Sequence, residues 1–143
     1  MPTRILCTTD GSKAAQKGVA YAVELAKNNG GSLTFLNVVT VSARRAARTY
    51  FWDQEILDAA AAQVHKILGA ATGVAAGAGL RDVSCVTVSG RNIPDAITAY
   101  AKKNDVDHII VGSQNKRGAA RLLVSSVAGG VAARASCPVT IVP

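Results

Sequence analysis

A polar and basic stretch near the carboxyl terminus carries the residues best suited to hold an anion. The apolar run His108-Ile109-Ile110-Val111 precedes Gly112, and a segment with Lys116 and Arg117 then leads to Ser126. The apolar run is typical of a strand buried on both faces, and a glycine at its end lets the backbone turn sharply. Ser126 suits the N-cap of a following helix, whose first N–H groups carry partial positive charge. The stretch therefore predicts a phosphate site between a strand and a helix.

The elements that would position this site alternate between strand and helix along the whole chain. Strands are expected at Arg4 to Thr8, Leu33 to Val39, Val83 to Val88, Asp107 to Val111 and Pro138 to Val142. Helical patterns lie between these runs, and no linker interrupts them. This alternation predicts one α/β domain over residues 1–143, with a parallel sheet covered by helices on both faces.

Two of the expected helices have recognisable signals. Residues 9–12 (Thr-Asp-Gly-Ser) supply a cap for the first helix, and residues 28–31 (Asn-Asn-Gly-Gly) end it. Its apolar stripe consists of Ala15, Val19, Ala22, Val23 and Ala26. The second helix begins near Asp53, and the glycines from Gly69 to Gly79 are expected to fray its end.

The last strand is expected at an edge of the sheet. It is apolar, but it is entered through Pro138, which cannot donate to a hydrogen-bond ladder. An exposed apolar edge favours pairing with another chain. The sequence therefore predicts a symmetric homodimer through Pro138 to Val142.

Composition bounds the class of protein. The 143 residues are 49% hydrophobic, which is enough for one compact domain, and no apolar run is long enough to cross a bilayer. The amino terminus lacks the apolar core of a signal peptide, so a cytoplasmic location is expected. Cys7, Cys85 and Cys137 suit small buried hydrophobes in a reducing compartment. A net charge of +7 favours phosphate-bearing partners.

Several other activities have weaker signals. The chain contains no Walker loop, no GxGxxG fingerprint after the first strand and no Gly-x-Ser-x-Gly elbow. His65 and His108 are isolated from other metal-ligand types, so no metal site is expected. The segment Arg44 to Trp52 mixes arginines with aromatics and could contact nucleic acid, but aromatics make up only 4% of the chain. A solvated segment whose aromatic end packs on the domain is preferred there, and nucleic-acid binding is not favoured.

Three segments together resemble the universal stress protein family, over nearly the whole chain. They are residues 5–12 (ILCTTDGS), residues 36–39 (LNVV) and the stretch from Ile109 through Ser126-Val127-Ala128 to Cys137-Pro138-Val139. The resemblance implies a Rossmann-like five-stranded parallel sheet with the strand order 3-2-1-4-5. It also implies dimerisation through the last strand, in agreement with the edge argument.

The resemblance further implies a set of ligand contacts. Thr9, Asp10, Val38 and Val111 would lie near adenine and ribose, with Asp10 accepting a hydrogen bond and the valines forming apolar walls. Asp10 could equally be a turn carboxylate. The phosphates would meet backbone N–H groups of Gly112, Asn115, Ser125, Ser126 and Val127, the Ser126 hydroxyl, and the charges of Lys116 and Arg117.

The chain departs from the family's ATP motif at two positions. ATP-binding members carry Gly-x-x-Gly, nine residues, and then Gly-Ser or Gly-Thr; here Gly112 and Ser126 match, but Asn115 and Ser125 replace two glycines. Asparagine is the non-glycine residue that best tolerates positive φ, so Asn115 would preserve the loop. The Ser125 side chain occupies space near the phosphates, where it could clash or donate a hydrogen bond.

The predicted function is that of a small regulatory module that binds ATP or another adenine nucleotide, with or without Mg²⁺. Efficient turnover is not expected, because no general base is evident. Two alternatives stay open. One is a non-nucleotide-binding family member that acts through contacts with an unknown protein partner. The other is a weak nucleotide hydrolase that uses Gln114, Lys116 or Arg121.

Overall fold

A computed structural model of the chain contains a five-stranded parallel sheet. Its strand order is β3-β2-β1-β4-β5, as predicted. The structure describes residues 3–40, 54–113 and 126–143. In chain order the elements are β1 (Arg4–Thr8), α1 (Lys13–Asn29), β2 (Ser32–Thr40), α3 (Gln54–Gly77), β3 (Val83–Gly90), α4 (Ile93–Lys103), β4 (His108–Gly112), α5 (Ser126–Arg134) and β5 (Val139–Val142).

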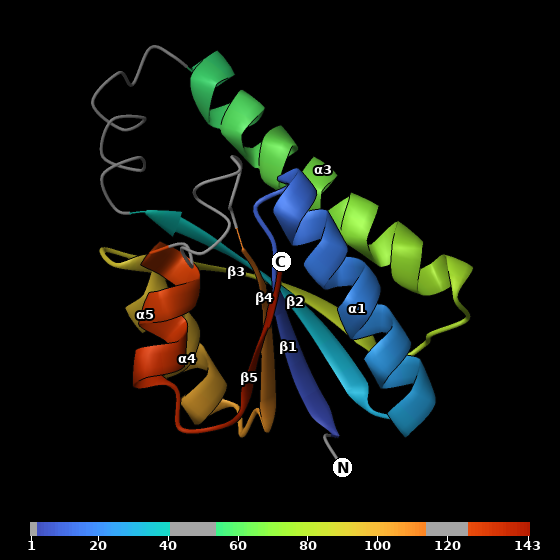
Figure 1. Cartoon of the computed structure of the whole chain (residues 1–143). Coiled ribbons are helices and arrows are strands. Elements are labelled where there is room, and N and C mark those ends of the chain that lie inside the picture. The colour runs from blue at the N-terminus through green and yellow to red at the C-terminus, as the bar shows by residue number, and fades with distance from the viewer. Residues whose placement is uncertain (1–2, 41–53, 114–125) are drawn as a thin grey trace.

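Helices cover both faces of the sheet, and each face has its own core. Figure 1 shows α1 and α3 on one side, with α4 and α5 on the other. The central strand β1 alternates between the two cores: Ile5 and Cys7 face α1 and α3, and Leu6 faces α4 and α5. All three are at most 2% exposed, because a central parallel strand is buried on both faces.

Helix α1 begins and ends where the sequence predicts. The Ser12 side chain caps it by accepting a hydrogen bond from the Ala15 N–H, and Gly30 ends it in the left-handed region at φ 66°. The predicted stripe is buried against the sheet: Ala15, Val19, Ala22, Val23 and Ala26. Packing of this apolar face therefore places the start of α1 at the end of β1.

The predicted fraying of α3 is wrong, because the helix continues through Gly69 and Gly73 to Gly77. Ala71 and Ala75 are 3% and 0% exposed within the core beneath α1 and α3. Burial of these small side chains holds the helix together despite its glycines. The chain leaves the helix only at Gly79, where φ is 84°.

The cysteines do not share one environment, contrary to the expectation that all are small buried hydrophobes. Cys7 is buried in the core, and burial raises the pKa of its thiol to about 12, so it is inert as a nucleophile. Cys85 is exposed because β3 is an edge strand, and Cys137 is half-buried before β5.

In the described parts of the chain, no helix has the length and apolar character needed to cross a membrane.

Candidate functional site

A cavity of about 240 Å³ opens at the carboxyl ends of β1, β2 and β4, beside the first turns of α1, α4 and α5. This end of a parallel α/β sheet is where ligands commonly bind. The residues around the cavity are Thr8, Thr9, Asp10, Ser12, Ala15, Leu36, Asn37, Val38, Ile93, Ile97, Val111, Gly112 and Val127.

The walls on the α4 and α5 side are apolar. Val38 and Val111 come from the sheet, Ile93 and Ile97 from the first turns of α4, and Val127 from the start of α5. These side chains belong to the core between the sheet and this helix pair. The cavity therefore lies where this core ends, at the carboxyl ends of the strands. Its apolar walls suit a flat apolar ring.

The turn between β1 and α1 forms the polar side of the cavity. The Thr9 N–H donates to the Leu36 carbonyl at 2.9 Å, which extends the pairing of β1 with β2 by one bond. The Thr9 hydroxyl then accepts from the Gly11 N–H at 3.3 Å, and Asp10 Oδ1 accepts from the Ser12 N–H at 2.9 Å. Gly11 has φ of 81°, which glycine adopts without strain. Asp10 is thus an exposed turn carboxylate that also borders the cavity.

Asn37 of β2 holds this turn in place through a side-chain hydrogen bond. Its side chain is 7% exposed, and its Nδ2 group donates to the Thr9 carbonyl at 2.9 Å. A buried amide bonded to a backbone carbonyl is costly to remove, because the carbonyl would lose its partner. Asn37 therefore fixes the position of Thr9 and, through it, the start of the Asp10 turn.

Gly112 lets the end of β4 approach the first turn of α1, which differs from the expectation of a sharp backbone turn. Positive φ occurs at Gly11, Gly30 and Gly79 among the described glycines, and not at Gly112. A Cβ on Gly112 would instead collide with the Ala14 carbonyl and lie 2.9 Å from the Ala15 nitrogen. Gly18, one turn further along α1, packs on Gly112 in the same way, with its Cβ position 3.3 Å from the Gly112 nitrogen.

The phosphate side of the predicted site is described only in part. Ser126 is exposed and already belongs to α5, so the prediction that it is the cap before this helix is wrong. Its backbone N–H and that of Val127 belong to the first turn, which carries partial positive charge. The remaining predicted residues lie outside the described ranges: Asn115, Lys116, Arg117 and Ser125, together with Gln114, Arg121 and the segment Arg44 to Trp52.

Two further features concern the hydrogen bonding and the charge at this end of the sheet. The Ser113 hydroxyl, directly after β4, is buried and makes no hydrogen bond in the described structure. Among the described residues around the cavity, Asp10 alone is ionisable. Within residues 3–40, 54–113 and 126–143, no group of three or more His, Cys, Asp or Glu side chains could hold a metal ion.

The fold and this cavity define a Rossmann-like α/β protein with a candidate ligand site at the carboxyl end of its sheet. A match to the universal stress protein family covers residues 1–143. The chain therefore belongs to the universal stress protein family.

Individual relatives are distant but cover the chain. A putative universal stress protein of Staphylococcus aureus is 27% identical over 138 residues, which are 96% of this chain and 82% of the relative. The solved universal stress protein UspA from Lactobacillus plantarum is 26% identical, with a TM-score of 0.79 over 99% of this chain and 97% of its own. A universal stress protein solved in complex with cAMP is 25% identical, with a TM-score of 0.73 over 99% of this chain and 96% of its own.

The structure brings six of the predicted ligand residues around one cavity: Thr9, Asp10, Val38, Val111, Gly112 and Val127. Sequence reasoning missed Asn37, Ile93 and Ile97. Ile93 and Ile97 are spaced by four residues at the start of a helix, directly after a strand, and that pattern could have indicated a wall of the cavity. Asn37 is a polar residue at the end of an apolar strand, which is also a usable signal.

Proposed function

We propose that this protein binds ATP or another adenine nucleotide in the cavity and acts as a regulatory module without efficient turnover. The observation that supports it is the cavity itself, where apolar walls face a hydrogen-bonded turn that carries Asp10. An adenine ring would lie between Val38 and Val111 on the sheet side and Ile93 on α4. Asp10 would accept a hydrogen bond from the ribose.

The phosphates would extend toward the first turn of α5. The N–H groups of Ser126 and Val127, with the Ser126 hydroxyl, would donate to them. This part of the proposal also includes Gly112, the last residue of β4, and four residues that follow it in the sequence before α5: Asn115, Lys116, Arg117 and Ser125. Mg²⁺, where present, would be carried by the phosphates, since phosphates and water commonly supply most of its ligands.

A family relative supports an adenine nucleotide as the class of ligand. The solved universal stress protein that is 25% identical to this chain holds cAMP. The cavity volume of about 240 Å³ lies near the lower limit of ligand pockets, roughly 300 Å³. It therefore suits the nucleoside part of a nucleotide, with the phosphates outside the apolar walls.

The chemistry of the described part of the cavity supports regulation without turnover. Asp10 is its one ionisable residue in the described structure, and Asp10 Oδ1 already accepts from the Ser12 N–H. A hydrolase would need a group that activates the attacking water near the phosphates. We further propose that the protein is cytoplasmic and forms a homodimer through β5, whose outer edge has no strand partner in the described sheet.

Isothermal titration of ATP, AMP, cAMP and adenosine, with and without Mg²⁺, tests this function. Micromolar binding of an adenine nucleotide, with negligible phosphate release over hours, is the expected result. Val38→Phe should fill the cavity and abolish binding, whereas Val39→Phe, one residue along β2 and outside the cavity lining, should bind normally.

A Ser125→Gly variant separates the alternatives. Binding by this variant, with none by the parent, would mean that Ser125 closes the site and that the protein acts through protein contacts. If neither protein binds any of the four ligands, the proposed function is wrong.

Sedimentation of the parent and of a Thr140→Pro variant, which disrupts β5, tests the dimer.

A further inference from the structure

Helices α4 and α5 approach each other very closely at one point, where Gly130 of α5 packs on Pro94 of α4. A Cβ built on Gly130 would lie 2.6 Å from Pro94 Cγ and 2.8 Å from Pro94 Cβ. Real Cβ atoms do not approach other carbons so closely, and Pro94 is a buried, rigid ring in the first turn of α4. Any side chain at position 130 would therefore push α5 away from α4.

This contact lies next to the candidate site. Gly130 is one turn along α5 from Val127, which lines the cavity, and Pro94 follows Ile93, which lines the cavity from α4. The helix pair thus forms one side of the cavity, and the distance between the two helices sets where the first turn of α5 lies. Figure 1 shows α4 and α5 side by side on the same face of the sheet.

A second link holds the same two helices together on the outside. The Arg134 side chain forms an ion pair with Asp95 of α4, with Nε 2.9 Å from Oδ1. The same guanidinium donates from its Nη1 nitrogen to the Gly130 carbonyl at 3.1 Å. Arg134 therefore joins Asp95, next to Pro94, to the backbone of Gly130, and it keeps the two helices at the separation that the glycine allows.

We propose that Gly130 is a positioning residue for nucleotide binding. It lets α5 pack on Pro94 so that the first turn of α5 reaches the phosphates. The inference rests on the proposed function and adds which residue sets the approach of the helix to the ligand. Because the partial charge of a helix terminus acts over only about one turn, a small displacement of α5 weakens phosphate binding.

Gly129 provides a matched control in the same helix. A Cβ built on Gly129 has no neighbour within 4 Å, whereas Gly130 has three within that distance. Alanine at either position favours the helical backbone equally. The two substitutions therefore have the same effect on helix propensity, and they differ in the contacts that the new methyl group would make with Pro94 of α4 and with the Arg134 guanidinium.

The experiment compares ATP and adenosine binding by the parent, Gly130→Ala and Gly129→Ala. We expect Gly130→Ala to bind ATP about tenfold more weakly, as for the loss of one interaction at a helix terminus, and adenosine within about twofold of the parent. Gly129→Ala should bind both ligands like the parent. Equal ATP affinity in the two variants, or an equal loss for ATP and adenosine in Gly130→Ala, would overturn the proposal.

Two further variants keep the test decisive. The double variant Pro94→Gly/Gly130→Ala removes both ring carbons that the new methyl group would meet. The remaining near atom, Arg134 Nη1 at 2.9 Å, ends a flexible side chain that can shift, so ATP affinity should recover; failure to recover contradicts the proposed contact. If Gly130→Ala does not fold, Asp95→Asn loosens the same helix pair at an exposed position. It should weaken ATP binding about twofold, although loss of a negative charge alone would strengthen it.

Asp105→Asn is the control for Asp95→Asn, because it removes an exposed carboxylate at the other end of the sheet. ATP affinity in Asp95→Asn equal to or above that of Asp105→Asn would count against the proposal. A parent that does not bind ATP would instead refute the proposed function. Failure of the inference and failure of the function therefore give different results.

Discussion

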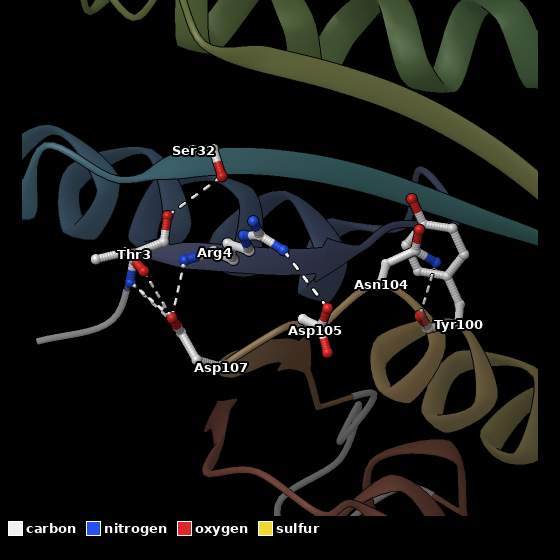
Figure 2. Close-up of polar contacts among 7 residues, drawn as sticks. All are labelled: Thr3, Arg4, Ser32, Tyr100, Asn104, Asp105 and Asp107. Carbon is white, nitrogen blue, oxygen red and sulfur yellow. Dashed lines mark hydrogen bonds and ion pairs between the residues drawn. The ribbon is translucent and has the colours of Figure 1, made fainter.

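The two ends of the parallel sheet use polar residues in opposite ways. At the amino end, Figure 2 shows a network in which the Asp107 carboxylate accepts from the Thr3 N–H, the Thr3 hydroxyl at 2.9 Å and the Arg4 N–H at 3.1 Å. The Ser32 hydroxyl donates to the Thr3 carbonyl at 3.2 Å, which joins β2 to the same network. These groups bond to one another, and they hold the starts of β1, β2 and β4 together.

At the carboxyl end, the polar groups hold short turns and leave a cavity between apolar walls. Thr9, Asp10 and Asn37 bond to backbone groups nearby, and the Ser113 hydroxyl has no partner in the described structure. The polar groups of the amino end therefore stabilise the sheet, whereas the carboxyl end leaves open the cavity in which we propose that a ligand binds. Changes at the amino end should therefore alter stability alone, and changes at the carboxyl end should alter stability and binding together.

The largest expected effect is at Gly112, where the end of β4 packs on α1. Gly112→Ala should lower the free energy of unfolding by about 3 kcal/mol, because the added methyl group collides with backbone atoms that cannot move independently. Nucleotide binding should be lost as well, since Ala15 and Gly112 both line the cavity. Urea unfolding and ATP titration measure the two effects. Gly129→Ala, with open space around it, should be as stable as the parent or more so, and an equal loss there would contradict the explanation.

The next effect compares two amide side chains that donate to backbone carbonyls at opposite ends of the sheet. Asn37→Asp removes the donor to the buried Thr9 carbonyl and should destabilise the fold by about 2 kcal/mol. It should also weaken ATP binding about fivefold, because the Asp10 turn loses its support. The matched control is Asn104→Asp, where the amide donates to the Tyr100 carbonyl at an equal 2.9 Å but is exposed (Figure 2).

For the Asn104→Asp control we expect a loss of at most about 0.5 kcal/mol from the charge at the end of α4, and no change in ATP affinity. Thermal unfolding and titration of both variants decide the matter. Equal effects of the two substitutions on ATP binding would remove the contrast between the two ends.

A smaller effect is expected from the amino end itself. Burial alone raises the pKa of the Asp107 carboxyl, but hydrogen bonds from Thr3 and Arg4 outweigh it and hold this pKa below its usual value. Its contribution to stability is therefore present above the unfolded pKa, about 3.9, and is lost as pH falls through the folded pKa. Asp107→Asn should cost about 1 kcal/mol at pH 7, and the difference from the parent should shrink toward pH 3.

ATP affinity should not change in Asp107→Asn, because the carboxylate lies at the end of the sheet opposite the cavity. Urea unfolding across pH, with ATP titration at pH 7, provides the measurement. Asp105→Asn removes only the exposed contact with Arg4, 3.8 Å long, and should leave stability nearly unchanged. A fall in ATP affinity in Asp107→Asn would show that the two ends are not independent.

Most of the fold could be predicted from the sequence, because strand and helix signals alternate without interruption. The strand order came from the resemblance to the family, and the structure confirms it. Local sequence patterns gave wrong predictions where the outcome depends on packing between distant elements. The glycines of α3 look like helix breakers until Ala71 and Ala75 are buried, and Cys85 looks buried until β3 lies at an edge.

The predicted ligand residues came from the resemblance to the family, and the structure places six of them around the cavity. Among them, Thr9 directly follows β1, and Val38 and Val111 lie near the carboxyl ends of β2 and β4. The packing role of Gly112 could not be predicted, because the residues that it packs against, Ala14 and Ala15, are almost a hundred residues away in the chain. Gly130 and Pro94 were missed for the same physical reason: a helix-to-helix contact leaves no periodic signal in either helix.

The smallest expected effects come from removing two hydroxyl groups, one at each end of the sheet. The resulting changes in the free energy of unfolding should have opposite signs. The Ser113 hydroxyl is buried and has no hydrogen-bond partner among the described residues, so Ser113→Ala should raise the free energy of unfolding by about 0.5–1 kcal/mol in the absence of ligand. Thr3→Val removes a hydroxyl that donates to Asp107 at 2.9 Å and should lower it by a similar amount. Thermal unfolding of the two variants, without nucleotide, measures both signs. A loss in Ser113→Ala would mean that its hydroxyl is already satisfied in the free protein, and that the carboxyl end is no less self-contained than the amino end.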